Sequence, residues 1–519
     1  MDFNTETLES LCELVVDCPH STPKWTDSGI IVLRNQNIKN GVLDLSNPSF
    51  TNEEDYQKRV KRAIPRAGDI VITREAPMGD VCIIPEGLKC CLGQRQVLLR
   101  PRNEICGEYL FWALQSPYVQ HQISWNEGTG TTVSNVRIPV LKALMIPRFP
   151  KHEKQSAKIL SVLASKLEIN QQTNQTLEQM AQALFKSWFV DFDPVFDNLL
   201  ASVDFNVENL ETSLPDELKQ KAQRRLAALN SLHNATECKA SLIALAHELQ
   251  AQLPTKEATQ SAVQVSEKAA ETPVKPNFSA NPKILTQHAN THAHFPSEFE
   301  HNEQLGWIPK GWKSGTFKDV ADGLSGYAFK GKDFSEFGCA VLKIKNISTD
   351  RTVTISDVNR VLPEVVDNLH RFLLNDGDII MAMTGAGSVG RFGVVATENN
   401  EPYYLNQRVC KLSPKLKNGA PFLFSALNQP GLEEVIFKAA QGSGQPNISV
   451  NGILATTLLI PSLSTVELFS RLLKDTYDRK ITLRKECYKL VKLRDTLLPK
   501  LISGELQIPD VATDDETVD

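Results

Sequence analysis

The sequence contains no apolar run long enough to cross a membrane. A spanning helix needs about 20 consecutive apolar residues, and the 519-residue chain nowhere approaches that length. Its first residues, MDFNTETLES, also lack the basic region followed by an apolar region with which a secretory signal begins. We therefore expect a cytoplasmic protein with no membrane partner.

A paired-cysteine motif is also lacking. None of the ten cysteines belongs to a C-x-x-C pair, and only Cys90 and Cys91 are adjacent. That spacing is the usual mark of zinc sites and of thiol redox sites. The sequence therefore predicts reduced cysteines that serve packing, and no metal site in this chain.

The chain has no excess of positive charge, since 56 Lys and Arg stand against 61 Asp and Glu, a formal net charge of −5. Nucleic-acid binding needs only a local density of cations, so this balance does not exclude it. Acidic residues gather in the last ten positions, five of which are Asp or Glu, and this leaves room for a basic face elsewhere. A chain of this length should form at least two domains.

What the sequence does contain is a long internal duplication. Residues 29–34 match residues 338–343, a displacement of 338 − 29 = 309 residues. The displacement reaches 461 − 147 = 314 at the Ile-Pro pairs that end in Pro147 and Pro461. So small a drift indicates two copies of one domain that differ by short insertions.

Each copy predicts a mainly β domain. Short apolar runs such as Asp69–Thr73 and Asp378–Ala382 alternate with glycine, proline and asparagine, which is typical of strands and turns. Helix is expected near Tyr109–Gln115 and Pro421–Leu427. Each copy is therefore expected to be rich in sheet with few helices.

A long helix is predicted after each copy, because apolar residues recur at alternating spacings of three and four. Pro147 and Pro461 end the preceding strands, and Ser462 or Ser464 could cap the second helix. Either each helix lies on its own domain or the two helices pair. We favour pairing, because polar residues interrupt the seam and such residues often set register. The predicted seam residues are Leu160, Leu163, Leu167, Leu177 and Leu184 in the first helix and Phe469, Leu473, Leu483, Leu490 and Leu497 in the second.

Two short motifs superficially suggest catalysis. Gly385–Gly390 fits the dinucleotide fingerprint G-x-G-x-x-G, but Arg391–Ala396 reads as a strand where that motif needs a helix. We interpret it as a glycine-rich hairpin. Val190–Phe196 resembles the Asp-Pro-Pro-aromatic motif of amino-methyltransferases but lacks the second proline. We interpret it as the end of the first long helix.

Residues 195–300 form an insertion without a partner in the other copy. Leu210–Leu253 is rich in Leu, Ala, Glu, Lys and Gln and predicts helix, whereas Thr255–Thr291 resembles a flexible linker. The function of the insertion cannot be read from its composition.

Three histidines near the end of this linker could bind a metal by spacing alone. Because they fall in a linker, we expect a solvated cluster at His288, His292 and His294. No Cys-His, Ser-His-Asp or paired-carboxylate arrangement recurs in both copies, which argues against a duplicated active site.

Polar residues recur among the strand ends and glycine loops of both copies. Arg and Lys suit guanine edges or phosphates, and Asn and Gln suit adenine edges. The Gln-Arg pair at 94–95 recurs at 407–408 although two different readers should differ at base contacts, so we expect it to position phosphates or serve the scaffold. Sequence-specific contacts are expected in the divergent loops Asn40–Arg62 and Thr349–Arg371. The candidate DNA-binding residues are Arg34, Asn37, Arg62, Thr73, Arg74, Gln94, Arg95 and Thr131 in the first copy and Lys343, Lys345, Asn346, Arg371, Thr384, Arg391, Gln407, Arg408, Ser443 and Gln445 in the second.

Taken together, these features resemble the specificity (S) subunit of type I restriction-modification systems. The resemblance rests on the order domain, helix, domain, helix, on the Gly-Asp-Ile openings and Ile-Pro endings, and on the helix terminators Leu184–Pro194 and Leu497–Glu505. It implies an α+β fold of two tandem mainly-β target-recognition domains, each followed by a long helix, the two helices pairing as an antiparallel coiled coil. The implied segments are target-recognition domain 1 at 1–149, helix 1 at 150–194, a helical and flexible linker insertion at 195–300, target-recognition domain 2 at 301–461, helix 2 at 462–504 and an acidic tail at 505–519.

The resemblance also implies a function in host defence. Each domain would read one half of a bipartite, asymmetric site in double-stranded DNA, and the helices, roughly 60 Å long for about 40 residues, would set the spacing and dock two methyltransferase (M) subunits. Adenine methylation with S-adenosylmethionine would belong to those partners, and ATP- and magnesium-dependent cleavage to restriction (R) subunits. This chain would hold no cofactor and would not be an enzyme. Two alternatives stay open, a stand-alone DNA methyltransferase or nuclease and a helical protein-interaction scaffold.

Overall fold

The computed structural model describes residues 4–125, 135–210, 214–232, 234–251, 290–398, 401–440 and 446–508. These residues form two units, one made of residues 1–170 with 487–519 and the other of residues 171–486. We call the part of the first unit that precedes its long helix domain 1, and the part of the second unit from residue 299 to residue 460 domain 2. Among the residues so described, no helix is both long and apolar enough to span a bilayer.

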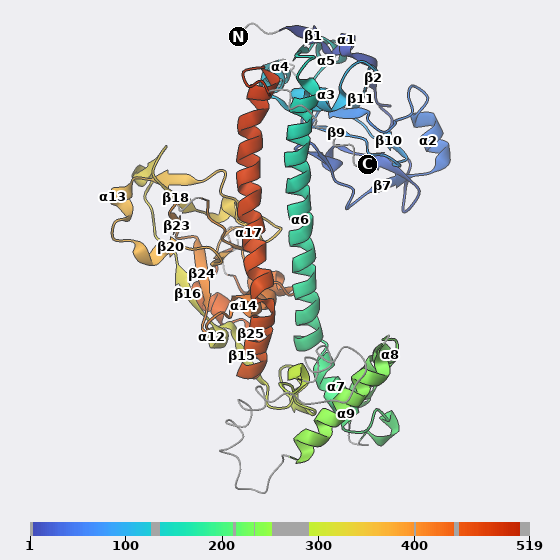
Figure 1. Ribbon diagram of the computed structural model, residues 1–519. Helices are drawn as coiled ribbons and strands as arrows, with labels where there is room; N and C mark the ends of the chain where they lie inside the picture. The colour runs from blue at the N-terminus through green and yellow to red at the C-terminus, as the bar shows by residue number, and fades with distance from the viewer. Residues whose placement is uncertain are drawn as a thin grey trace, which may run out of the picture. The chain divides into compact units, whose positions relative to one another are not determined.

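Domain 1 is built on two four-stranded sheets (Figure 1). The first is antiparallel in the order β2-β11-β8-β9, and the second has the order β10-β4-β7-β3, in which β10 and β4 are parallel. Two further pairs, β1 with β12 and β5 with β6, complete the strands. The strands are β1 (Thr5–Thr7), β2 (Cys12–Asp17), β3 (Trp25–Thr26), β4 (Ile30–Leu33), β5 (Ile38–Lys39), β6 (Val42–Leu43), β7 (Ser49–Thr51), β8 (Ile70–Thr73), β9 (Val81–Ile83), β10 (Cys90–Leu92), β11 (Gln96–Pro101) and β12 (Met145–Pro147).

Five helices cover domain 1, and one of them supplies much of its core. The buried face of α3 packs with Ile70 and Ile72 of the first sheet, and all of Tyr109–Leu114 is buried. The hydroxyl of Tyr109 donates a 3.0 Å hydrogen bond to the carbonyl of Pro147, which satisfies its one buried polar atom. The helices are α1 (Leu8–Leu11), α2 (Glu53–Arg59), α3 (Gly107–Gln115), α4 (Pro117–Trp125) and α5 (Ile138–Lys142).

Domain 2 repeats this plan. A four-stranded antiparallel sheet has the order β16-β24-β21-β22, and a five-stranded sheet has the order β17-β19-β18-β23-β20, in which β18 and β23 are parallel. Its strands are β13 (Phe299–Asn302), β14 (Gly306–Pro309), β15 (Lys313–Thr316), β16 (Ala321–Ser325), β17 (Phe334–Ser335), β18 (Cys339–Leu342), β19 (Asn359–Val361), β20 (Leu373–Leu374), β21 (Ile379–Ala382), β22 (Phe392–Val394), β23 (Tyr403–Leu405), β24 (Val409–Pro414) and β25 (Thr457–Ile460), and its helices are α12 (Phe317–Val320), α13 (Pro363–Val366), α14 (Ala420–Leu427), α15 (Leu432–Ala439) and α16 (Val450–Leu454). The expected mainly β domains, with helix near 109–115 and 421–427, are confirmed.

One glycine in each copy shows why the duplicated pattern persists. Gly29 and Gly338 have φ angles of 135° and 109°, a region that side-chain-bearing residues rarely adopt. A Cβ atom at these positions would lie 2.5 Å from the carbonyl oxygen of Thr51 and 2.2 Å from that of Val361. Only glycine fits where the chain enters β4 and β18.

The structural alignment corrects the displacement expected near the end of the repeat. The sequence match reached a displacement of 314 at the Ile-Pro pairs that end in Pro147 and Pro461. Isolated bridges join Glu75 to Asn135 and Thr384 to Asn447, so Asn135 corresponds to Asn447, a displacement of 447 − 135 = 312. The last strands keep this displacement, since Thr7 pairs with Met145 and Thr316 pairs with Thr457, so the two Ile-Pro pairs are not structural equivalents.

The long helices α6 (Glu153–Phe189) and α17 (Leu463–Ile502) pack together (Figure 1). In the first unit, Leu160 of α6 shares a buried cluster with Leu498 and Leu501 of α17. In the second unit, the rings of Phe185 and Phe469 lie 5.7 Å apart between centroids. The beginning of α6 thus meets the end of α17 and its end meets the beginning of α17, which confirms antiparallel pairing. Each helix also packs on its neighbouring domain, so the two arrangements considered from the sequence coexist.

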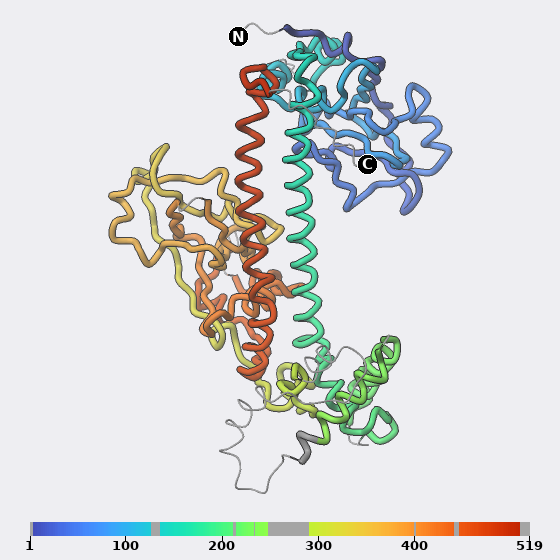
Figure 2. Tube along the Cα trace, viewed as in Figure 1, coloured from blue at the N-terminus to red at the C-terminus, as the bar shows by residue number. Residues whose placement is uncertain are grey.

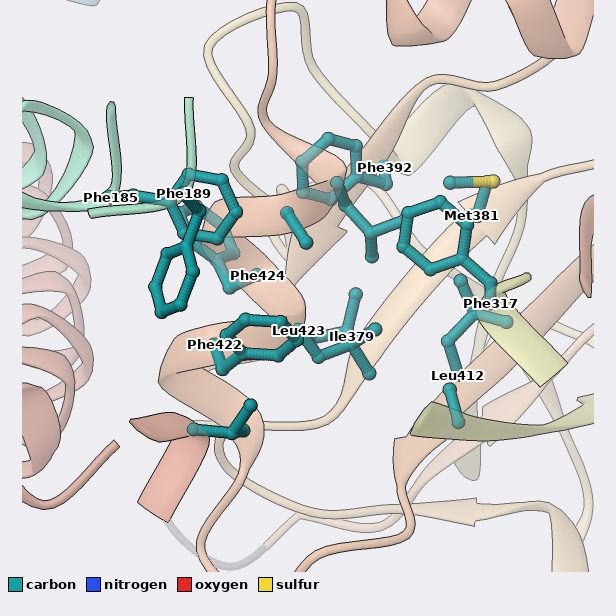
Figure 3. Close-up of a cluster of buried hydrophobic side chains, with 14 of the residues drawn as sticks. Phe185, Phe189, Phe317, Ile379, Met381, Phe392, Leu412, Phe422, Leu423 and Phe424 are labelled. Carbon is teal, nitrogen blue, oxygen red and sulfur yellow. The ribbon is translucent and has the colours of Figure 1, made fainter. Parts of the chain in front are cut away.

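All ten predicted seam residues are buried or partly buried. The sequence missed the aromatic residues at the end of α6, which make the densest contact. Phe469 is fully buried, with ring centroids 5.6 Å from Trp188, 5.2 Å from Phe189 and 6.3 Å from Phe422. Figure 3 shows Phe185 and Phe189 beside Phe422 and Phe424 of α14. This cluster fastens both helices to domain 2.

The start of α17 and the end of α6 follow the sequence signals. Ser462 caps α17, since its hydroxyl accepts a 3.2 Å hydrogen bond from the backbone N–H of Thr465. The helix α6 ends at Phe189, and Phe192 adopts a left-handed φ of 60° before Pro194 opens the next helix. The Val190–Phe196 motif therefore follows the end of the first long helix, where it was expected to form that end, and it joins α6 to α7.

The insertion contains the helices α7 (Asp193–Ala201), α8 (Asp216–Asn230) and α9 (Ala235–Ala251), drawn in green in Figure 2. Asp197 is fully buried and accepts two 2.7 Å hydrogen bonds from Arg225, while Nε2 of His292 lies 2.9 Å from it. Burial raises the pKa of Asp197, but the hydrogen bonds from Arg225 and His292 outweigh it and leave the pKa below its usual value.

The solvated histidine cluster expected from the sequence is wrong for His292. Its side chain is 5% exposed and held against Asp197, because the chain returns to α7 at this point. His294 is partly buried, and His288 lies outside the described residues. Most of the Thr255–Thr291 segment likewise lies outside them.

The pairing of the helices includes one ion pair that can be tested. Lys480 of α17 pairs with Glu178 of α6, and their side chains are 15% and 24% exposed. Glu178 also accepts a 2.5 Å hydrogen bond from Asn428. Removing the cation leaves a largely buried carboxylate without its partner.

We expect Lys480→Met to lower the free energy of unfolding by about 2–3 kcal/mol, somewhat less than for a fully buried pair. The double variant Glu178→Leu/Lys480→Met should recover most of that loss. Lys474→Met is the matched control, because Lys474 forms an exposed ion pair with Asp478 on the same helix. Urea denaturation measures all three, and equal losses for the two single lysine variants would contradict the prediction.

Candidate nucleic-acid interface

Four segments meet at the carboxyl ends of the parallel strands in domain 1. The backbone N–H of Gly93, after β10, donates to the carbonyl of Leu33 at the end of β4, at 2.8 Å. Arg74, after β8, donates its N–H to Arg95 at 2.8 Å and accepts from Val136 at 3.1 Å. The segments after β4, β8 and β10 therefore lie together with residues 135–136.

Domain 2 brings the equivalent segments together with the same bonds. Asn406 donates to the carbonyl of Leu342 at 3.1 Å, and Met383 donates to Arg408 at 3.0 Å and accepts from Ile448 at 2.9 Å. We call these two sets of loops the loop clusters. Cluster 1 contains residues 34–37, 74–79, 93–95 and 135–136, and cluster 2 contains residues 343–346, 383–390, 406–408 and 446–448.

The first residue of each cluster is a cation whose side chain packs over an aromatic ring. The guanidinium of Arg34 is exposed and lies 5.3 Å from the ring centroid of Trp25. Nζ of Lys343 lies 3.7 Å from the ring centroid of Phe334. Burial lowers the pKa of Lys343, and the neighbouring Lys345 lowers it further. Both cations are thus positioned by an aromatic neighbour.

Asn37 and Asn346 hold the loops instead of facing solvent. Asn37 is 3% exposed, accepts a 3.0 Å hydrogen bond from the N–H of Arg34 and donates to the carbonyl of Asp44 at 2.9 Å. Asn346 is 2% exposed and makes the same bond to the N–H of Lys343 at 2.9 Å. A scaffold role explains these residues without DNA.

Thr73 and Arg74 are likewise occupied within the domain. The hydroxyl of Thr73 is buried and accepts from the N–H of Asp80 at 3.0 Å. Arg74 donates to both carboxylate oxygens of Asp17 at 2.9 and 3.0 Å and to the carbonyl of Val136 at 3.0 Å. These bonds tie the ends of β2 and β8 to the segment at 135–136.

The shared Gln-Arg pairs are exposed in both clusters. Gln94 donates to the carbonyl of His20 at 2.6 Å. Nε of Arg95 lies 2.9 Å from Glu75, and its side chain is 54% exposed. Arg408 occupies the same place in cluster 2, and among the described residues it has no ion-pair partner.

The other candidate residues are spread around the two domains. Arg62 is exposed and donates to the carbonyl of Asp17 at 3.3 Å, Lys345 pairs with Asp357 at 2.8 Å, and Arg371 lies against Phe372. Thr384 lies within cluster 2. Arg391 lies at its edge, and its guanidinium donates to the carbonyl of Gly387. Thr131, Ser443 and Gln445 lie outside the described residues.

Residues 2–179 and 309–493 match the family described as the type I restriction modification DNA specificity domain. The chain belongs to this family. Its two matched segments are the two copies with most of the helix that follows each. Residues 180–308, which include α7, α8 and α9, lie between the matches, so the insertion is additional to the family's domain.

Curated relatives agree with this membership. The chain is 23% identical over 472 residues to the type I restriction enzyme HindI specificity subunit of Haemophilus influenzae, covering 88% of this chain and 90% of that protein. It is 21% identical over 456 residues to the MjaIX specificity subunit of Methanocaldococcus jannaschii, covering 87% and 80%. The crystal structure of a type I S subunit from M. genitalium aligns over 96% of both chains with 15% identity and a TM-score of 0.48.

Sequence reasoning missed two acidic residues that hold cluster 1 together, Glu75 within it and Asp17 beside it at the end of β2. Glu75 and Asp17 were not candidates, because carboxylates are not expected to face phosphates. Asn135 donates to Glu75 at 2.7 Å and accepts from Arg74 at 3.3 Å, so it links the two ion pairs. No local pattern marks these residues, since Asn135, which binds Glu75, and Arg74, which binds Asp17, are 60 and 57 residues away along the chain.

The glycine-rich motif at Gly385–Gly390 has a structural explanation. Gly385–Gly390 connects β21 to β22, which pair antiparallel, so it is a hairpin as expected and lacks the helix that a dinucleotide site requires. Within the ranges that the structure describes, no group of three or more His, Cys, Asp or Glu is arranged to hold a metal ion.

The buried and the exposed polar residues of cluster 1 should behave differently on substitution. Asn37→Ala removes a buried amide and leaves the N–H of Arg34 and the carbonyl of Asp44 without their partner, so we expect it to lower the free energy of unfolding by about 2 kcal/mol. Arg34→Ala, its matched control three residues away, should leave stability unchanged and weaken DNA binding.

Thermal unfolding of the chain and DNA affinity of the assembled complex measure the two effects. A stable Asn37→Ala protein with weakened DNA binding would contradict the scaffold role and favour direct contact by Asn37.

Proposed function

We propose that this chain is the non-catalytic DNA-recognition subunit of a type I restriction-modification complex. Each domain reads one half of a bipartite, asymmetric site in double-stranded DNA. The observation that carries the proposal is the pair of loop clusters, in which one backbone scaffold presents different side chains. Arg34, Arg74 and Glu75 in cluster 1 stand where cluster 2 has Lys343, Met383 and Thr384.

The proposal assigns base readout to the side chains that differ and scaffold roles to those that are buried and shared. Arg34, Arg62, Gln94 and Arg95 are the proposed DNA contacts of domain 1. Those of domain 2 are Lys343, Lys345, Arg371, Thr384, Arg391, Gln407 and Arg408. Cations at these positions suit phosphates or guanine edges, which is the chemistry a DNA-reading surface needs.

The proposal gives the chemistry of modification and cleavage to partner proteins. Two M subunits would dock on the helix pair and carry S-adenosylmethionine, and R subunits would use ATP and magnesium. The family match to a DNA specificity domain supports this division. The antiparallel hairpin at Gly385–Gly390 speaks against a cofactor site of the Rossmann type in this chain. Such a complex would act in the cytoplasm, where the DNA lies.

The helix pair has a second proposed task, which is to set the distance between half-sites. Helices of 37 and 40 residues have lengths of roughly 55–60 Å at 1.5 Å per residue. An interaction scaffold alone would not need two loop clusters with divergent polar residues.

The decisive experiment exchanges one domain at a time. Residues 1–149 are replaced by the matching segment of the Haemophilus influenzae relative, and the chimaera is expressed with its M subunits. We expect one half of the methylated sequence to change and the other half to persist, because each domain reads separately. Genome-wide mapping of methylated adenines measures this.

The reciprocal exchange of residues 301–461 is the control and should change the other half only. An unchanged methylated sequence in both chimaeras would contradict the proposal. Methyl transfer by the purified chain without partners would instead establish the stand-alone enzyme.

A further inference from the structure

The same arginine occupies the same backbone position in both loop clusters. The carbonyl of Arg95 accepts from the N–H of Arg74, and that of Arg408 accepts from the N–H of Met383. Each follows the shorter strand of the parallel pair and precedes a central strand, β11 or β24. Identical residues at equivalent places would ordinarily be given one role.

Their electrostatic surroundings nevertheless differ. Nε of Arg95 is 2.9 Å from Glu75, whose side chain is only 20% exposed. Glu75 is itself held in place, because Asn135 donates to its carboxylate at 2.7 Å and the amide of Asn35 donates to its backbone carbonyl. The carboxylate is therefore a fixed part of the scaffold, and it fixes Arg95.

The position of Glu75 is taken by Thr384 in cluster 2, as the bridges to Asn135 and Asn447 establish. Threonine supplies no charge, and Arg408 is exposed without an ion pair in the part of the chain that is described. Arg95 also has a left-handed φ of 67°, a conformation that Arg408 does not share. The two arginines thus differ in backbone conformation as well as in the partners of their guanidinium groups.

These differences predict different affinities for phosphate and for bases. The Glu75–Arg95 pair has no net charge, so its attraction for a phosphate is weak. Glu75 lies beside Nε of Arg95 and so orients the guanidinium, whose terminal nitrogens form the fork that matches O6 and N7 of guanine. Arg408 keeps its full charge and its freedom of movement, which suit a backbone phosphate.

We infer that Glu75 makes Arg95 a base-reading residue of domain 1, whereas Arg408, lacking such a carboxylate, is a phosphate contact of domain 2. Glu75 is a positioning residue in this assignment. The inference rests on the proposed function, since it concerns how the two domains use one scaffold to read DNA. It revises the expectation that both Gln-Arg pairs position phosphates or serve the scaffold.

The test uses the full chain assembled with its M subunits and duplexes that carry the methylated site. Binding is measured against salt concentration and against single base-pair changes in each half-site. We expect Arg95→Lys, which keeps the charge and loses the fork, to reduce discrimination at one base pair by roughly tenfold with an unchanged salt dependence. Arg408→Lys is the matched control and should change neither quantity.

Two further variants probe the charge itself. Arg408→Gln should make the slope of log affinity against log salt less negative by about 0.9, the value for one phosphate contact, without altering base preference. Glu75→Thr should make that slope more negative by about the same amount. It should also reduce discrimination between base pairs as Arg95→Lys does. Arg95 and Arg408 are exposed and Glu75 is partly buried, so thermal unfolding verifies that each of the four variants is folded.

The outcomes separate the inference from the function on which it rests. If the unaltered complex fails to discriminate any base pair, the proposed function fails. If it discriminates but Arg95→Lys retains full discrimination, or Arg408→Gln leaves the salt slope unchanged, the inference is overturned while the proposed function stands.

Discussion

The parallel pairing of two short strands in each domain is the constraint on which the proposed recognition surface depends. Parallel strands end at the same edge of a sheet, so the loops after β4 and β10 become neighbours although about 60 residues separate them in the chain. The pair β18 and β23 repeats this arrangement. The bonds that join the loops are backbone to backbone, and they do not depend on the identity of the side chains. One scaffold can therefore carry two different readers.

The neighbours of a residue decide what the residue contributes. Arg74 is held by Asp17 and Asn135, whereas its counterpart Met383 has no polar side chain to offer. A carboxylate beside Arg95 changes the charge that DNA would meet, although the arginine itself recurs in the second copy. A duplicated domain can thus acquire a new binding preference by a change at a supporting position, without any change at the position that makes contact.

The helix pair and the insertion depend on buried polar and aromatic contacts near the end of α6. Aromatic rings from α6, α14 and α17 surround Phe469, and a largely buried ion pair lies farther along the same helices. The insertion is fastened by Asp197, which receives hydrogen bonds from Arg225 and His292. Because these partners lie 28 and 95 residues from Asp197, a helix that reads as part of a linker becomes an ordered part of the second unit.

The sequence by itself determined the duplication, the strand runs at 69–73 and 378–382, the two long helices and the hairpin at 385–390. Each of these features follows from local periodicity, from the positions of glycine and proline, or from a match between two segments of the same chain. Only the tertiary structure decided that Asn37 and Thr73 are buried, that His292 faces Asp197 and that Glu75 holds Arg95. The reason is physical: periodicity reports which face of an element is apolar, whereas the partner of a polar side chain is set by which distant segments the fold brings within hydrogen-bonding distance.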